Sequence, residues 1–198
     1  KFYFLKGRAY YGSKDFKTAA DSFEKLFSLE KETGKLRYTE PATTIQNQMV
    51  QDVYQKASDL YSAKEYKNAS DSFYLTYKLS KLDTIFIYNA AVSSSLAKDY
   101  DTSLKYYQEL QDMGYTGISK VYYATNKSTD EKEDLGDKKN RDLQVKLGLY
   151  TNPVDELTPS KTGDITKNVA YILKSQGKTD EAIKAVEAAR ALYPNDIN

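Results

Sequence analysis

The sequence predicts a mainly α-helical solenoid of stacked antiparallel helix pairs, interrupted by one small β-containing insertion. Three observations lead to this prediction. A pattern of small and aromatic residues recurs along the chain, two of its copies are 34 residues apart, and only one long segment breaks the helical spacing of apolar residues. Because one helix pair cannot cover its own apolar face, such units must stack to form a core.

Each copy of the pattern has a large residue, a small residue three positions later, and a second large residue four positions after that. The copies are Phe16, Ala19 and Phe23; Tyr66, Ala69 and Phe73; Tyr100, Ser103 and Tyr107; and a weaker Thr179, Ala182 and Val186. Ala69 and Ser103 are 34 residues apart, but Ala19 and Ala69 are 50 apart, and Ser103 and Ala182 are 79 apart. Two insertions therefore interrupt a regular array.

Another small residue lies twelve positions before each of these, at Gly7, Ala57, Ala91 and Ala170. Two helices pack closely only where slim side chains meet at their crossing, so each pair of small residues predicts a pair of helices. The predicted helix pairs cover residues 1–12 and 15–32, 42–63 and 65–81, 84–98 and 100–113, and 164–176 and 179–193.

The residues at several helix ends support these bounds. Gly34 is expected to stop the second helix, and Pro41 suits the first turn of a long third helix that absorbs the first insertion. Asp83 or Thr84 is expected to cap the fifth helix, and Asp164 the helix that begins there.

The second insertion, residues 116–163, departs from the helical pattern. Residues 120–125 have strand propensity and residues 127–130 read as a turn, so we expect a small β-hairpin. Asp137 is then predicted to cap a helix that continues to about Leu149, and residues 151–163 are predicted to form a loop.

The repeats resemble the tetratricopeptide repeat (TPR) family. Besides the small and aromatic positions, the resemblance rests on the turns Lys14-Asp15-Phe16, Lys64-Glu65-Tyr66, Lys98-Asp99-Tyr100 and Gly177-Lys178-Thr179. Pro194 stands where the family often has proline, whereas Tyr3, Val53, Ile87 and Thr166 replace the family's tryptophan. The resemblance implies a single TPR domain over residues 1–198, with repeats near 1–32, 42–81, 84–114 and 164–195.

Within that family, residues 122–127, 141–148 and 165–170 are similar to envelope proteins of Bacteroidetes. Such relatives usually begin with an export signal, which implies a periplasmic or cell-envelope location. The chain opens on Lys1 inside a predicted helix, so we expect it to be a piece of a longer protein.

The resemblance also implies that the first helix of each pair lines a concave groove in which a protein or peptide partner lies. The residues predicted to bind that partner are Phe4, Arg8, Tyr11, Tyr54, Tyr61, Tyr88, Tyr171 and Lys174. Tyrosine and arginine are common anchors of protein interfaces. The alternatives are that several of these rings only pack between repeats, or that the insertion fills the groove.

Composition argues against most other functions. The absence of Cys and His excludes thiol nucleophiles, Cys-based zinc sites and His-dependent triads. The 29 basic and 28 acidic residues alternate along the chain, which disfavours nucleic-acid binding, and no apolar run approaches the roughly 20 residues of a membrane span. The acidic run at residues 130–134 lacks the pattern of a calcium loop. We therefore expect neither a metal nor a cofactor.

Catalysis is not expected either. The adjacent pairs Asp99 with Asp101 and Asp155 with Glu156 have nothing that would align them on a substrate. The sequence thus predicts a non-enzymatic scaffold that binds a protein or peptide. Two alternatives stay open, namely a structural or self-assembling component of an envelope complex, and an accessory domain of a larger protein whose activity lies elsewhere.

Overall fold

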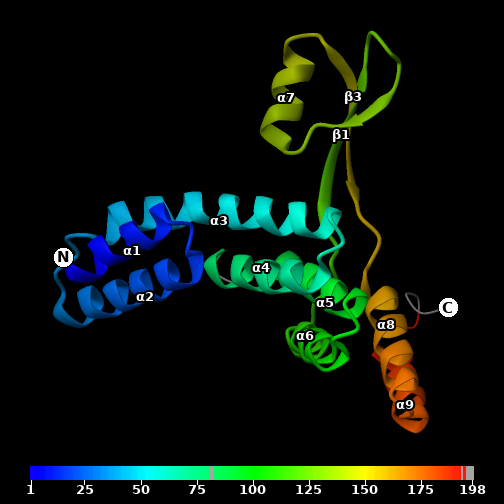
Figure 1. Ribbon diagram of the computed structural model, residues 1–198. Coiled ribbons are helices and arrows are strands. Elements are labelled where there is room, and N and C mark those ends of the chain that lie inside the picture. The colour runs from blue at the N-terminus through cyan, green and yellow to red at the C-terminus, as the bar shows by residue number, and fades with distance from the viewer. Residues whose placement is uncertain (81–82, 193, 195–198) are drawn as a thin grey trace. The chain divides into compact units, whose positions relative to one another are not determined.

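The computed structural model describes residues 1–80, 83–192 and 194, which fall into two compact units (Figure 1). The first unit ends at Gly114 and the second begins at Tyr115. The described part of the first unit is entirely helical, whereas that of the second combines helices with a small sheet.

The helices of the first unit are α1 (Phe2–Gly12), α2 (Phe16–Thr33), α3 (Thr39–Ser62), α4 (Tyr66–Leu79), α5 (Thr84–Leu96) and α6 (Tyr100–Asp112). They pack as the pairs α1 with α2, α3 with α4 and α5 with α6, and α4 also packs along α5 (Figure 1). The predicted mainly α-helical stack of helix pairs is confirmed. The predicted end of the fourth helix at Lys81 lies outside the described residues.

Slim residues occupy the helix crossings, as the sequence predicts. Gly7, Ala19, Ala57, Ala69, Ala91 and Ser103 are all buried. The contact at Gly7 is the tightest, because a Cβ atom there would lie 2.5 Å from Cε1 of the buried Phe23 ring. Ser103 adds a polar link within its pair, since its hydroxyl donates a hydrogen bond to the Ala91 carbonyl at 2.9 Å.

The turn inside each helix pair has the same backbone geometry. Its central residue is left-handed, with φ near 60° at Lys14, Lys64 and Lys98 and 77° at Gly177. At Lys64 the N–H donates to the carbonyl three residues back, and the next N–H donates to the carbonyl five residues back. The same two hydrogen bonds recur in the other three turns, so the chain reverses direction identically in all four pairs.

The long helix α3 is capped by a residue from the preceding helix. The buried carboxylate of Glu30 in α2 accepts hydrogen bonds from the N–H groups of Tyr38 and Thr39 at 2.9–3.0 Å and from the Thr39 hydroxyl at 2.8 Å. Burial alone raises the pKa of Glu30, but the hydrogen bonds from Thr39, Tyr38 and Arg37 outweigh it and lower the pKa. A negative charge thus sits at the positive end of α3, which suits the helix dipole.

The second unit contains β1 (Lys120–Asn126), β2 (Lys132–Asp134), α7 (Lys138–Lys146), β3 (Tyr150–Leu157), α8 (Thr162–Ser175) and α9 (Thr179–Leu192). The three strands form an antiparallel sheet in the order β2-β1-β3. The predicted hairpin is confirmed as β1 and β2. The predicted end of the last helix at residue 193 lies outside the described residues.

The prediction of a loop over residues 151–163 was wrong, because its first part is the strand β3. The Asn152-Pro153 sequence that suggested a loop forms a β-bulge instead. In the register, Tyr123 pairs with Val154 and Thr125 with Thr151, so β3 has one extra residue opposite Ala124. Asn152 takes a left-handed φ of 48° there, and the bulge at a sheet edge accommodates a proline that has no N–H.

Two predicted helix ends in this unit were also wrong. Helix α8 begins at Thr162 with Lys161 at its N-cap, so Asp164 lies in the first turn and does not cap the helix. Helix α7 ends at Lys146 and not near Leu149, because Gly148 takes a left-handed φ of 76° just beyond it. The predicted Asp137 cap is confirmed, and its carboxylate accepts from the Asn140 N–H at 2.9 Å.

Helix α7 is fixed to the sheet by one buried cation. The guanidinium of Arg141 donates to Asp155 on β3 and to Asp142 on α7, and it lies 5.5 Å from the centre of the Tyr122 ring on β1. The hydrogen bond from Arg141 lowers the pKa of Asp155. The short helix thus depends on a charge pair for its place in the insertion.

We expect Gly7→Ala to lower the free energy of unfolding by about 1–2 kcal/mol, because overpacking against Phe23 outweighs the better helix propensity of alanine. Gly12→Ala in the same helix is the matched control, because a Cβ there meets nothing within 4 Å. Urea titrations of both variants measure the difference. Equal stability of the two variants would contradict the close crossing.

We expect Glu30→Gln to lower the melting temperature at about pH 7 and to lose this effect as the pH falls through the folded pKa of Glu30. The folded pKa of Glu30 lies below its ordinary 4.5, so its stabilisation is complete above pH 4.5 and disappears as the pH falls through the folded value. Thermal melts across this range give the comparison, with the exposed Glu24→Gln as control. A constant difference from wild type at every pH would rule out the charged cap.

Candidate functional site

An aromatic cluster on α3, α4 and α5 holds two of the predicted binding residues. The ring of Tyr54 lies 6.3 Å from Phe73 on α4 and 5.5 Å from Phe86 on α5. Two turns further along α3, Tyr61 lies 5.5 Å from Tyr66 and 6.5 Å from Phe73. Tyr54 and Tyr61 nevertheless remain 40% and 39% exposed. We call these two residues the α3 tyrosine surface.

These rings pack between helices and are also partly exposed. Tyr54 bridges two repeats, as the packing alternative requires, and still presents part of its ring to solvent. Tyr88 lies on the neighbouring α5, is half-buried, and takes part in contacts of its own.

The α1 residues of the predicted set differ in their exposure. Phe4 belongs to the core, where its ring stacks on Tyr38 with the centroids 5.0 Å apart. It therefore has little surface to offer a partner. Tyr38 is the N-cap residue of α3, and its ring covers that of Phe4. Arg8 is exposed, with its guanidinium 5.7 Å from the Phe4 ring centre.

Tyr11 connects α1 to α3 and is only half-exposed. Its hydroxyl donates a hydrogen bond to the Asp52 carboxylate at 2.7 Å, and the same carboxylate accepts from Gln48 at 3.2 Å. The hydrogen bond to Asp52, together with burial and the negative charge, raises the pKa of Tyr11 to about 12. The polar end of Tyr11 is thus engaged in holding the first repeat to the second.

The remaining two predicted residues lie in the second unit. Tyr171 and Lys174 are exposed on α8 and line a shallow groove between α8 and α9. The predicted set is therefore divided, with six residues in the first unit and two in the second. Whether these residues bind a partner stays a prediction.

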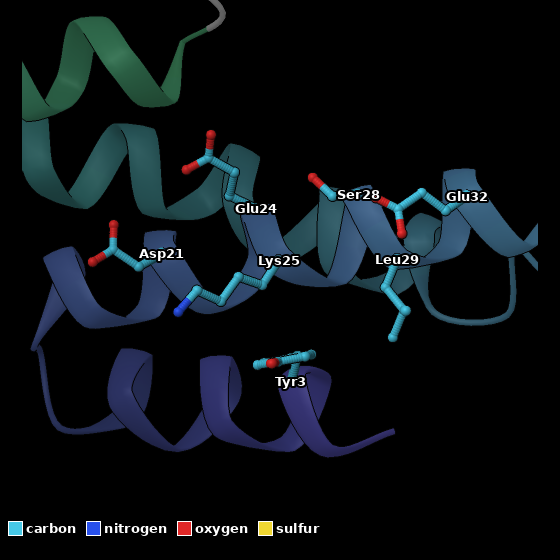
Figure 2. Close-up of a pocket in the computed structure, with 7 residues that line it drawn as sticks. All are labelled: Tyr3, Asp21, Glu24, Lys25, Ser28, Leu29 and Glu32. Carbon is cyan, nitrogen blue, oxygen red and sulfur yellow. The ribbon is translucent and has the colours of Figure 1, made fainter.

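The structure also shows hollows that the sequence did not predict. One of about 580 Å³ lies between α1 and α2, where Tyr3 faces the exposed side of α2 (Figure 2). Its carboxylates, Asp21, Glu24 and Glu32, are spread along α2 and do not converge on one point (Figure 2). Across the described residues, no three acidic side chains come together as a metal ion would need.

A larger cleft of about 740 Å³ separates α2 from α4, and Phe27, Leu75 and Leu79 supply its apolar lining. The only sequence signal for it is the first insertion, which lengthens α3 and so moves the second repeat along the stack.

The acidic pairs considered above have structural partners. Asp99 caps α6 by accepting from the Thr102 N–H, Asp155 pairs with Arg141, and Glu156 pairs with Lys132. These contacts use the carboxylates to cap α6, to hold α7 on β3 and to link β2 with β3. Among the described residues, no helix combines the length and the apolar composition that a membrane crossing requires.

Comparison with known proteins adds a family match for the start of the chain. Residues 1–33, about a sixth of the sequence, match the family model of the tetratricopeptide repeat. A search of curated proteins gives no match. Among solved structures, the chain is similar to the crystal structure of the MamA protein, with 12% identity over 98% of this chain and 91% of that chain and a TM-score of 0.41.

At that TM-score the overall similarity adds nothing to the architecture, which rests on the packing described above. The comparisons do not confirm the resemblance to Bacteroidetes envelope proteins, and that resemblance stays a prediction. The family match coincides with α1 and α2, so the first helix pair of this chain is similar to a tetratricopeptide repeat.

Proposed function

We propose that the chain is a non-enzymatic scaffold that binds a protein or peptide segment. The segment lies against the surface formed by the first helix of each pair in the first unit. The observation that carries this proposal is the α3 tyrosine surface, where two large rings are partly exposed and yet held by neighbouring rings. Such rings supply contact area and a hydroxyl without first having to be ordered, which lowers the cost of binding.

The surroundings of these rings suit an interface. Ser58 lies four residues after Tyr54 and three before Tyr61 on the same helix, so it shares their face and places a hydroxyl beside the aromatic surface. Aromatic centres with a polar rim are the usual composition of protein interfaces. Tyr88 on α5 extends the aromatic character beyond α3.

A second candidate function is self-assembly, favoured by apolar side chains on the other end of the first unit. Phe2 and Leu5 on α1 and Leu29 on α2 are all at least about half exposed. Exposed apolar side chains of this size often mark a contact surface. Light scattering separates the two candidates, because assembly predicts a mass that rises with concentration.

We also propose that the scaffold acts in the bacterial cell envelope. The support is the resemblance carried by residues 122–127, 141–148 and 165–170. Fractionation of the source cells, followed by detection of the protein with an antibody, tests this location; recovery only from the cytoplasmic fraction would contradict it.

We expect Tyr54→Ala and Tyr61→Ala each to weaken partner binding by about thirtyfold, the effect of losing an interface anchor worth about 2 kcal/mol. Tyr10→Ala is the matched control, because Tyr10 is 37% exposed on α1 and lies outside the α3 tyrosine surface. Affinity capture from the native cell, with the captured proteins quantified by mass spectrometry, compares the three variants with wild type.

Circular dichroism melts confirm that all three variants are folded before capture. We expect wild type and Tyr10→Ala to capture the same partner proteins, and both α3 variants to lose them. A set of captured proteins that none of the substitutions changes would refute the tyrosine surface as the binding site.

A further inference from the structure

Helices α8 and α9 form a groove in the second unit that has an apolar floor and a charged rim. Ala170 and Ala182 lie where the two helices cross, and Tyr171, Ile183 and Val186 line the groove, whose volume is about 530 Å³. Tyr171 is 61% exposed and Ile183 is 52% exposed. Large side chains are thus displayed on both helices of the pair.

The same surface exists in the first unit, on the pair α3 and α4. The two helix pairs align in sequence with the same difference in residue number throughout. Ala57 then aligns with Ala170, Ala69 with Ala182, and the turn residue Lys64 with Gly177. The turns at Lys64 and Gly177 have the same pair of backbone hydrogen bonds, so the two helix pairs correspond residue by residue. This correspondence places Tyr171 at the position of Ser58 and Ile183 at that of Ser70. It likewise places Val186 at the position of Phe73 and Arg190 at that of Tyr77.

In the first unit a third helix covers this surface. Helix α5 lies along α4, and Ser70 is buried beneath it. The Ser70 hydroxyl donates to the Ala90 carbonyl at 2.9 Å and shares a hydrogen bond with the Ser94 hydroxyl at 2.5 Å. Ile183, at the position of Ser70, is by contrast half exposed. A helix pair with this geometry therefore accepts a further helix in the groove.

We propose that the α8–α9 groove binds an amphipathic helix of a partner protein, in the place that α5 takes on α3 and α4. The chemistry of the groove defines that helix. Ile183 replaces the hydrogen-bonding Ser70, so the incoming helix presents alanine or aliphatic side chains there. Lys174 and Arg190 take the sequence positions of Tyr61 and Tyr77 and are both exposed, so the helix carries acidic side chains beside its apolar stripe.

The charges at the rim favour such a partner over a second copy of this chain. Lys174 and Arg190 outnumber the one rim carboxylate, Glu187. Two copies meeting through this face would place the same excess of cations on both sides of the contact. The helix α5 of a second copy is already packed in its own first unit. An acidic amphipathic helix of a partner protein would not repel the cations of the groove, and it is not already packed within this chain.

The probe for a test is a fluorescein-labelled, hydrocarbon-stapled peptide of about four turns. It carries Ala and Ile at the α5 positions that face α4, and Glu on both flanks of that stripe. Fluorescence anisotropy with the full chain measures its dissociation constant. A second peptide has Lys in place of every Glu.

We expect Ile183→Asp to weaken binding of the acidic peptide at least tenfold, because it puts a carboxylate in the apolar floor. Leu143→Asp is the matched control, since Leu143 is 50% exposed on α7 of the same unit and lies outside the groove. The double variant Lys174→Glu with Arg190→Glu is expected to weaken the acidic peptide and to strengthen the basic one. Tyr54→Ala is expected to leave both affinities unchanged, which separates this site from the α3 tyrosine surface.

Three results would overturn the proposal. The first is that neither peptide shows saturable binding. The second is that Ile183→Asp and Leu143→Asp weaken binding of the acidic peptide equally. The third is that the double variant Lys174→Glu with Arg190→Glu changes the affinity for neither peptide. Light scattering supplies a further check. A wild-type dimer that Ile183→Asp converts to a monomer would assign the groove to a second copy and refute the partner helix.

Discussion

The close approach of two helix backbones at a slim residue is the constraint on which the rest of this structure depends. A methyl group at Gly7 would enter the space of the Phe23 ring, and the alanines and serine at the other crossings of the first unit are equally buried. Because the backbones meet there, large side chains are displaced to the sides of each pair. Those side chains then form the contacts between repeats and the surfaces left over for other molecules.

This constraint explains why so much of the fold could be predicted from the sequence. Small residues twelve positions apart locate both helices of a pair, and Asp15, Asp83, Asp99 and Asp137 cap helices through local hydrogen bonds. Such signals involve residues within a few positions of one another. The observed bounds of α2, α4, α5 and α6 accordingly lie within two residues of the predicted ones wherever the chain is described.

The features that escaped prediction depend on partners far along the chain. Residues 150–157 became a strand because β1 offers an unpaired edge, although Asn152 and Pro153 have poor strand propensity. Glu30 belongs to α2 but caps α3. Tyr38 covers Phe4, and the repeat pattern in the sequence did not predict where Tyr38 would lie. The position of a residue in a repeat predicts where its side chain points, but not what the inserted segments place over it. Phe4 and Tyr54 hold the same position in their repeats, but Phe4 stacks on Tyr38 and is buried, whereas Tyr54 is 40% exposed.

The bulge in β3 has a consequence for how the insertion behaves among other chains. An open strand edge exposes a regular row of backbone donors and acceptors and invites a strand from another molecule to join. In β3, Pro153 has no N–H to donate, and the left-handed backbone at Asn152 interrupts the regular alternation of the row. The edge is therefore a poor template for intermolecular β-sheet. The insertion can therefore leave its β3 edge unpaired without inviting a strand of another chain to join there.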